Sequence, residues 1–157
     1  MPGEKLQQQN EFAKIILLLN QIDLFFSKKN RTMLNYILVS VGAAIGGAFR
    51  FGIASYIQKH ISVIFPYGTL VVNVVGTFII GIVMFYLSDK DLIGNELRLF
   101  LTVGFCGGFT TFSTFSYETF NLFRDSEILL AFYNVALNLV LCFIGIYLAY
   151  LISKIIG

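Results

Sequence analysis

Residues 104–120 read Gly-Phe-Cys-Gly-Gly-Phe-Thr-Thr-Phe-Ser-Thr-Phe-Ser-Tyr-Glu-Thr-Phe, an apolar stretch that carries two adjacent glycines and a run of hydroxyl side chains. A helix in lipid keeps its backbone N–H and C=O groups paired internally. Gly107 and Gly108, followed by Thr110 and Thr111, form a composition that lets this hydrogen-bond ladder open. We therefore expect a helix that is broken at membrane depth and lines a polar conduit or an ion site. The alternative is a continuous, tightly packed helix whose phenylalanines face lipid.

The same stretch places a phenylalanine at every third position. Phe109, Phe112 and Phe115 would lie along roughly one face of a helix. We expect these rings to accompany the polar groups along the conduit.

The whole chain is too apolar for an ordinary soluble domain. Of its 157 residues, 57% are hydrophobic and 13% are charged, and the mean hydropathy is +0.78. A helix of about 20 residues crosses a hydrocarbon core of about 30 Å. Stretches of this kind lie at residues 34–57, 68–87, 99–117 and 128–153. We predict an all-α integral protein of the cell membrane with four transmembrane helices per subunit, the third broken near its middle.

Nothing in the composition indicates an enzyme. The hydrophilic linkers are too short for a catalytic domain. Cys106 and Cys142 lie inside apolar stretches, where thiols usually pack as small residues, and Glu118 is the one carboxylate that approaches the interior of a span. The net charge of +2 comes from scattered basic residues, which form no nucleic-acid surface. We therefore expect neither catalysis nor nucleic-acid binding.

Residues 1–32 form an extension that differs from the transmembrane domain assigned to residues 33–157. Between residues 11 and 26, apolar side chains recur at roughly helical spacing, at Phe12, Ile15, Ile16, Leu18, Leu19, Ile22, Phe25 and Phe26. This pattern is typical of an amphipathic helix at the membrane interface. Alternatively, Met33 is the natural first residue and the preceding segment is an artefact. Both interpretations stay open.

The extension matters because positive charges orient a membrane protein. Counted from Met33, the side that would hold both termini carries Lys90, Arg98 and Lys154, and the opposite side carries Lys59 and Arg124. This near balance would permit insertion in both orientations. The basic residues of the extension change the count to eight against two and predict a single orientation with the N-terminus inside: Lys5, Lys14, Lys28, Lys29 and Arg31.

Polar side chains within the spans indicate a path for anions. Asn73 lies in the middle of the second stretch, where an unpaired polar group would cost several kcal/mol. An amide can donate hydrogen bonds to an anion without a full charge that would trap it. Asn134, Asn138 and Cys142 recur every four residues in the last stretch and share a face. Hydrogen bonds between helices are the alternative for all of these residues.

The first stretch contains a single charge and a pair of spaced glycines. Arg50 has no acidic partner at membrane depth. It either forms an electropositive vestibule that concentrates anions or extends its guanidinium to the interface. Gly42 and Gly46 are four residues apart, which predicts close contact with another helix.

Three segments resemble, in order, successive motifs of the Fluc/CrcB fluoride channels. They read Gly-Gly-Ala-Phe-Arg-Phe at 46–51, Gly-Thr-Leu-Val-Val-Asn-Val-Val-Gly at 68–76 and Gly-Phe-Cys-Gly-Gly-Phe-Thr-Thr-Phe-Ser-Thr-Phe at 104–115. The resemblance extends from Met33 to the C-terminus. It implies a passive, fluoride-selective channel that lets cytoplasmic fluoride leave the cell. It further implies an antiparallel, dual-topology homodimer with a structural sodium ion at its centre.

The resemblance also implies roles for individual residues. The backbone carbonyls of Gly107 and Thr110 would hold the sodium ion, and Arg50 would be the vestibule arginine. The fluoride pathway would be lined by Asn73, Phe112, Phe115, Thr111, Ser113, Thr114, Asn134 and Asn138, with Cys142 continuing the track of the last span.

Two other membrane functions compete with this interpretation. A small multidrug exporter that couples cationic drugs to protons has a similar length but needs a carboxylate deep in its first span, and residues 34–57 contain none. A purely structural subunit fits the composition. It gives no reason for Asn73 to lie beside an opened helix.

Overall fold

The computed structural model describes residues 2–61 and 64–156, and every regular segment among them is helical. Side chains of the first helix are described at positions 14, 17, 18 and 21 and from residue 29 onward. The helices are α1 (Pro2–Ile61), α2 (Tyr67–Ile82), α3 (Asn95–Leu99), α4 (Gly107–Phe109), α5 (Phe112–Arg124) and α6 (Ile128–Ile156), with π-helical segments η1 (Val83–Ser88) and η2 (Phe100–Cys106).

The chain separates into two compact units, of which the first ends at Tyr36 and the second comprises Ile37–Gly157. The first unit contains the beginning of α1, where Leu17 and Leu18 are exposed. Most of the apolar face expected for the extension falls on side chains outside the described residues: Phe12, Ile15, Ile16, Leu19, Ile22, Phe25 and Phe26. The amphipathic interpretation therefore stays a prediction.

The expected set of four membrane spans is confirmed among the described residues. The helical stretches long and apolar enough to cross a membrane are Lys29–Ile61, Tyr67–Ser88, Asn95–Arg124 and Ile128–Ile156. Their outward surfaces carry large apolar side chains such as Val103, Leu129 and Phe132. Apolar exposure on this scale suits lipid and would be a liability in water.

The third span is built from several helical pieces. Residues 95–109 run without a gap through α3, η2 and α4. Thr110 and Thr111 follow with extended backbone, at φ −85°, ψ 160° and φ −152°, ψ 118°. Helix α5 then begins at Phe112 and continues to Arg124.

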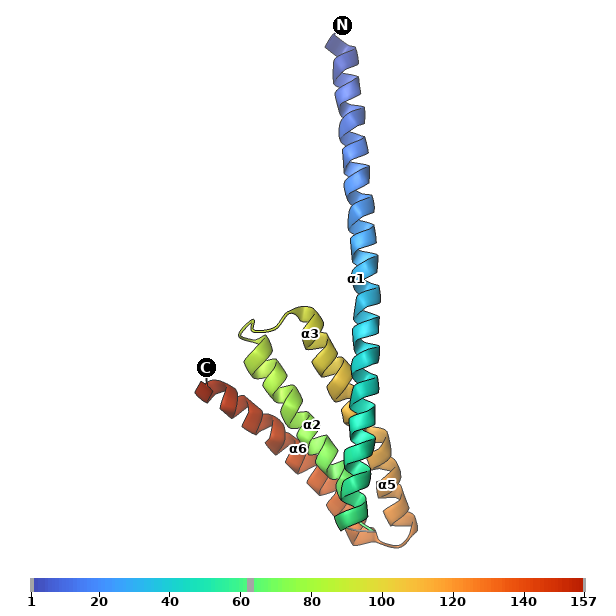
Figure 1. The fold of residues 1–157 in the computed structure, drawn as a ribbon, viewed down its shortest axis with the longest axis vertical. Helices are drawn as coiled ribbons and strands as arrows, with labels where there is room; N and C mark the ends of the chain where they lie inside the picture. Colours follow the sequence, from blue (N-terminus) through green and yellow to red (C-terminus); the bar gives the residue numbers. More distant parts are fainter. Residues whose placement is uncertain (1, 62–63, 157) are drawn as a thin grey trace. The chain divides into compact units, whose positions relative to one another are not determined.

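Small residues let α2 and α6 lie side by side in the second unit (Figure 1). A Cβ atom added at Gly81 would lie 2.6 Å from the Cβ of Ala149, and one added at Gly145 would lie 3.3 Å from the carbonyl oxygen of Val74. Side chains at these positions would force the two helices apart. The α2–α6 pair is therefore a close helix contact of the kind that small residues permit.

The part of α1 within the second unit makes a similar contact with η2 and α4. A Cβ atom at Gly42 would lie 2.7 Å from the carbonyl oxygen of Phe100, and one at Gly46 would collide with the backbone of Phe105. Gly108 in turn leaves no room for a side chain against the backbone of Ala43. The close contact expected at Gly42 and Gly46 is confirmed, and it involves the part of the third span that precedes the extended residues.

Candidate functional site

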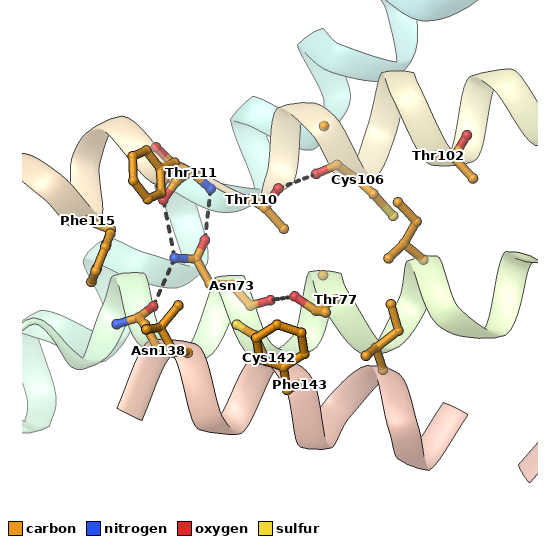
Figure 2. A pocket seen from close by; sticks show the side chains of 16 residues that line it. Asn73, Thr77, Thr102, Cys106, Thr110, Thr111, Phe115, Asn138, Cys142 and Phe143 are labelled. Carbon is orange, nitrogen blue, oxygen red and sulfur yellow. Dashed lines mark hydrogen bonds between the residues drawn. The ribbon is translucent and has the colours of Figure 1, made fainter. Parts of the chain in front are cut away.

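A cavity of about 480 Å³ lies beside the extended residues of the third span and is lined by side chains from α2, η2, α5 and α6 (Figure 2). We call it the Asn73 cavity. None of its lining residues is charged, and the polar and aromatic ones are Asn73, Thr77, Thr102, Thr110, Thr111, Phe112, Phe115, Asn138 and Phe143. The thiols of Cys106 and Cys142 face the same space. The site is thus polar without being ionic.

The backbone of Thr110 and Thr111 forms one wall of this cavity. Thr110 N–H still donates to the carbonyl of Cys106 at 2.9 Å, which closes the last turn of α4. Thr111 N–H instead donates to Oδ1 of Asn73 at 2.8 Å. The carbonyl of Gly107, four residues before Thr111, thereby loses the partner that a continuous α-helix would give it.

Asn73 is a buried residue of α2 whose amide contacts Thr111 twice. In addition to accepting the Thr111 N–H, its Nδ2 donates to the Thr111 carbonyl at 3.2 Å (Figure 2). The same nitrogen donates to Oδ1 of Asn138 on α6 at 3.0 Å. Asn73 therefore links three membrane spans through one side chain.

The asparagines of α6 continue this connection away from the cavity. Asn138 Nδ2 donates to the side-chain and backbone oxygens of Asn134, both at 3.0 Å. Asn134 donates to the hydroxyl of Thr119 at 2.8 Å, and that hydroxyl donates to the carbonyl of Phe115 at 2.7 Å. Four buried side chains thus form one directed hydrogen-bond chain between α2, α6 and α5.

The hydroxyls around the cavity bond to nearby protein oxygens. Thr77 donates to the carbonyl of Asn73 at 2.6 Å, and Thr110 donates to the carbonyl of Cys106 at 2.9 Å. Thr111 donates to Oγ1 of Thr114 at 3.0 Å. In this state these hydroxyl hydrogens point along the protein backbone or toward neighbouring hydroxyls.

The three phenylalanines of the third span do not share a face, so that expectation is wrong. Phe109 is 3% exposed and stacks on Phe105 with ring centroids 5.6 Å apart, whereas Phe112 is 78% exposed. Phe115 is buried, and its ring centroid lies 5.6 Å from that of Phe112. The extended residues between α4 and α5 interrupt the rotation per residue on which a shared face depends. Only Phe112 and Phe115 line the Asn73 cavity.

A second hollow, of about 380 Å³, lies on another side of Thr111, and we call it the Arg50 pocket. It is lined mainly by α1, α2 and α5, including Arg50, Thr69, Thr114 and Glu118. Arg50 Nη1 donates to the carbonyl of Thr110 at 3.4 Å, and the Thr69 hydroxyl donates to Glu118 Oε1 at 2.9 Å. Unlike the Asn73 cavity, this pocket contains groups that can carry charge.

The structure brings most of the residues singled out in the sequence to these two spaces. Thr114 lines the Arg50 pocket, Asn134 is fully buried behind Asn138, and Ser113 is an exposed residue that contacts the Thr111 hydroxyl at 3.2 Å. Sequence reasoning missed Thr69 and Thr77. Both lie four residues from Asn73, so helical spacing around that asparagine could have found them.

Backbone carbonyls are among the oxygen atoms near the extended segment that could bind a cation. Gly107 lines the cavity, and the Thr110 carbonyl accepts the long bond from Arg50. Among the described residues, no cluster of three or more His, Cys, Asp or Glu side chains is placed to hold a metal. Carbonyl oxygens are hard ligands, which suit a hard cation and not a transition metal.

Comparison with known proteins gives a consistent set of relatives. Residues 37–150 match the family described as CrcB-like protein, Camphor Resistance (CrcB). The chain is 38% identical over 122 residues to the fluoride-specific ion channel FluC of Methylocella silvestris, an alignment that covers 76% of this chain and 93% of the relative. It is 46% identical over 120 residues to FluC of Clostridium novyi, covering 76% of this chain and 94% of the relative. FluC of Geobacter metallireducens is 46% identical over 110 residues, covering 70% and 89% of the two chains.

Proposed function

The chain belongs to the CrcB family of multi-pass cell-membrane proteins, whose FluC members are ion channels and not enzymes, and we propose that it is a fluoride-specific channel. In this proposal fluoride leaves the cytoplasm passively, down its gradient, which relieves fluoride toxicity. No carboxylate lines the Asn73 cavity to carry a coupled proton. Passive conduction is the simpler mechanism for such a site.

The observation that carries the proposal is the uncharged cavity beside Thr110 and Thr111. Fluoride is small and strongly hydrated, so a selective path must replace its water with closely spaced donors. Aromatic ring edges carry positive partial charge and can face an anion without trapping it. The proposed pathway runs along the side chains of Asn73, Thr111, Phe112, Ser113, Thr114, Phe115, Asn134 and Asn138, with Arg50 at a vestibule.

A structural sodium ion is a further part of the proposal. Backbone carbonyls without their usual helix partner are suitable ligands for a hard cation, and the carbonyl of Gly107 fits this description. The carbonyl of Thr110 would be a second ligand, although it also accepts the weak bond from Arg50. Two carbonyls are too few for a cation. This count supports a site that is completed by a second subunit.

An antiparallel homodimer would supply that second subunit. Phe112 lines the Asn73 cavity yet is 78% exposed in the single chain, which supports a partner at this wall. The near balance of basic residues from Met33 onward supports insertion in both orientations. The basic residues of the extension favour a single orientation instead, so the orientation in the membrane needs its own experiment.

The channel proposal is tested with the purified full chain in vesicles loaded with potassium fluoride. Adding a potassium ionophore compensates the charge, and an external fluoride electrode follows efflux. We expect rapid fluoride release in the presence of sodium, with far slower release of chloride from matched vesicles. No fluoride release in sodium, or uptake of a cationic drug driven by protons, would remove the channel from consideration.

Orientation in the membrane is tested by removing two positive charges from the extension, either close to the first span or far from it. The double variant Lys28→Gln and Lys29→Gln removes charges beside the span, where they act most strongly on topology. The control, Lys5→Gln and Lys14→Gln, removes two charges about 20 residues or more from the apolar stretch. Labelling of single cysteines from each side of the membrane should show a larger share of the opposite orientation for the first variant than for the control. Equal labelling patterns in both variants would contradict the role of the extension.

A further inference from the structure

We propose that Asn73 holds the third span open at Thr110 and Thr111, acting as a positioning residue for the ion path and not as a ligand of the ion. The role of this contact in an ion path rests on the proposed channel function. Its structural basis is independent of any ion.

The amide of Asn73 bonds to both backbone groups of Thr111: it replaces the helical acceptor of the N–H and adds a donor at the carbonyl. Oδ1 accepts the Thr111 N–H at 2.8 Å, and Nδ2 donates to the Thr111 carbonyl at 3.2 Å. An extended residue presents its N–H and C=O on the same side, as in an antiparallel ladder, and a primary amide matches that pair. A helical residue directs these two groups in opposite directions along the axis and could not form both bonds. The pairing therefore stabilises the extended conformation specifically.

The donors of Asn73 are all in use. A primary amide nitrogen has two N–H bonds. One donates to the Thr111 carbonyl and the other to Oδ1 of Asn138 at 3.0 Å. Asn73 is 9% exposed. An anion that bound its nitrogen would have to displace one of these contacts and release the segment that the amide supports.

The orientation of the amide is fixed by its neighbours. Thr111 N–H can only donate, so the atom that faces it must be the oxygen of Asn73. On the opposite side, Asn138 is held by Asn134, so its own oxygen is turned toward Asn73. A rotated Asn73 amide would place N–H against N–H. The hydrogen-bond chain on α6 thus serves to hold one rotamer on α2.

Holding Thr111 extended determines two features of the site. It keeps the Thr111 N–H away from the carbonyl of Gly107, which stays available at the cavity. It also makes Thr111 the N-cap of α5, because its Oγ1 accepts the N–H of Thr114 at 3.1 Å. The first residue of α5 is Phe112, so the position of both cavity phenylalanines follows from the contact with Asn73.

The test measures exchange of the Thr111 amide hydrogen in the full chain, in detergent and without fluoride. Asn73→Ala should accelerate this exchange by about tenfold or more, because the N–H loses its buried acceptor. Asn121→Ala is the matched control, since Asn121 is a partly buried residue of α5 whose Oδ1 has no hydrogen-bond partner among the described residues. It should leave Thr111 exchange unchanged. Unaltered Thr111 exchange in Asn73→Ala would overturn the inference.

A second pair of variants decides the question if Asn73→Ala does not fold. Asn138→Leu and Asn138→Asp have similar size, but only the aspartate keeps an acceptor for Asn73 Nδ2. Leucine should accelerate Thr111 exchange, and aspartate should do so much less. Equal acceleration by both would contradict a positioning role transmitted through this bond.

Fluoride efflux from the same preparations separates this inference from the proposed function. Loss of efflux in Asn73→Ala with normal Thr111 exchange would show that Asn73 acts on the ion directly, against the inference. A wild-type chain without efflux, whose variants still change Thr111 exchange as expected, would refute the channel and leave the positioning role standing.

Discussion

The Asn73 cavity and the Arg50 pocket share Thr111 but differ in how their polar groups are used. In the cavity, the side chains of Asn73 and Asn138 are occupied by protein hydrogen bonds, and none of the lining residues is charged. In the pocket, and among the residues that the structure describes, Arg50 makes only a long bond of 3.4 Å, and Glu118 has one buried carboxylate oxygen without a partner. Under the proposed channel function, we expect a division of labour in which the cavity determines selectivity by fixed geometry and the pocket adjusts the local ion concentration by charge.

The largest effect should come from placing a charge in the cavity. Asn73→Asp adds a negative charge to an anion route and removes both N–H donors of residue 73. A like charge at about 4 Å costs about 4 kcal/mol at an effective dielectric constant of 20, so fluoride efflux should fall by about a thousandfold. Vesicle efflux measures the loss, and Asn121→Asp serves as the control outside the cavity. Unchanged efflux would remove residue 73 from the path.

The next effect concerns the exposed ring of the cavity. Phe112→Ile keeps an apolar side chain but removes the ring edge, and we expect efflux to fall about tenfold, as for a barrier raised by about 1.4 kcal/mol. The yield of folded protein should change little. Phe120→Ile replaces another exposed ring of α5 that does not line the cavity, and it should leave efflux near the wild-type rate. Equal losses of efflux and of folded yield in Phe112→Ile would indicate that this ring contributes to packing and not to conduction.

A smaller, salt-dependent effect should come from the Arg50 pocket. Arg50→Gln removes a charge that concentrates anions, so efflux should fall a few-fold at low ionic strength and less at about 0.5 M salt, where screening is nearly complete. Arg50→Lys keeps the charge but not the planar donor group. If lysine restores the rate, charge is what matters. If it behaves like glutamine, the contact with Thr110 is what matters, and the proposed division of labour would be wrong.

The smallest effect should have the opposite sign. Glu118→Gln keeps an oxygen that can accept the Thr69 hydroxyl and removes the capacity of this side chain for negative charge. Efflux at low ionic strength should rise by less than about threefold. Fluoride efflux from vesicles, measured at a low and a high salt concentration, gives the comparison. A decrease in rate would indicate that Glu118 supports the pocket structurally.

Much of the architecture could be predicted because lipid imposes strict local requirements. The four spans follow from the length and apolarity of uninterrupted stretches, and the close contact at Gly42 and Gly46 follows from their spacing. These features depend on neighbouring residues in the chain. Sequence patterns report such local constraints directly.

The conformation of the third span was harder to locate from its own residues. Gly107 and Gly108 followed by Thr110 and Thr111 predicted an opening in this segment but not which residues would leave the helix: both glycines are helical in α4, and the threonines are extended. Gly108 instead permits the close approach of Ala43. The prediction that Phe109, Phe112 and Phe115 share a face was wrong for the same reason. Two extended residues between α4 and α5 change the direction in which the following side chains point.

Composition and stretch length are enough to establish that this protein crosses the membrane four times and which segments do so, because burying a backbone in hydrocarbon requires long apolar helices. Which residues leave the helix depends instead on contacts between distant parts of the chain. Thr111 is extended because Asn73, 38 residues earlier in the chain, pairs with its backbone, and the orientation of Asn73 depends in turn on Asn138, 65 residues later. Contacts over such separations depend on how the helices pack and leave no periodic pattern in the sequence.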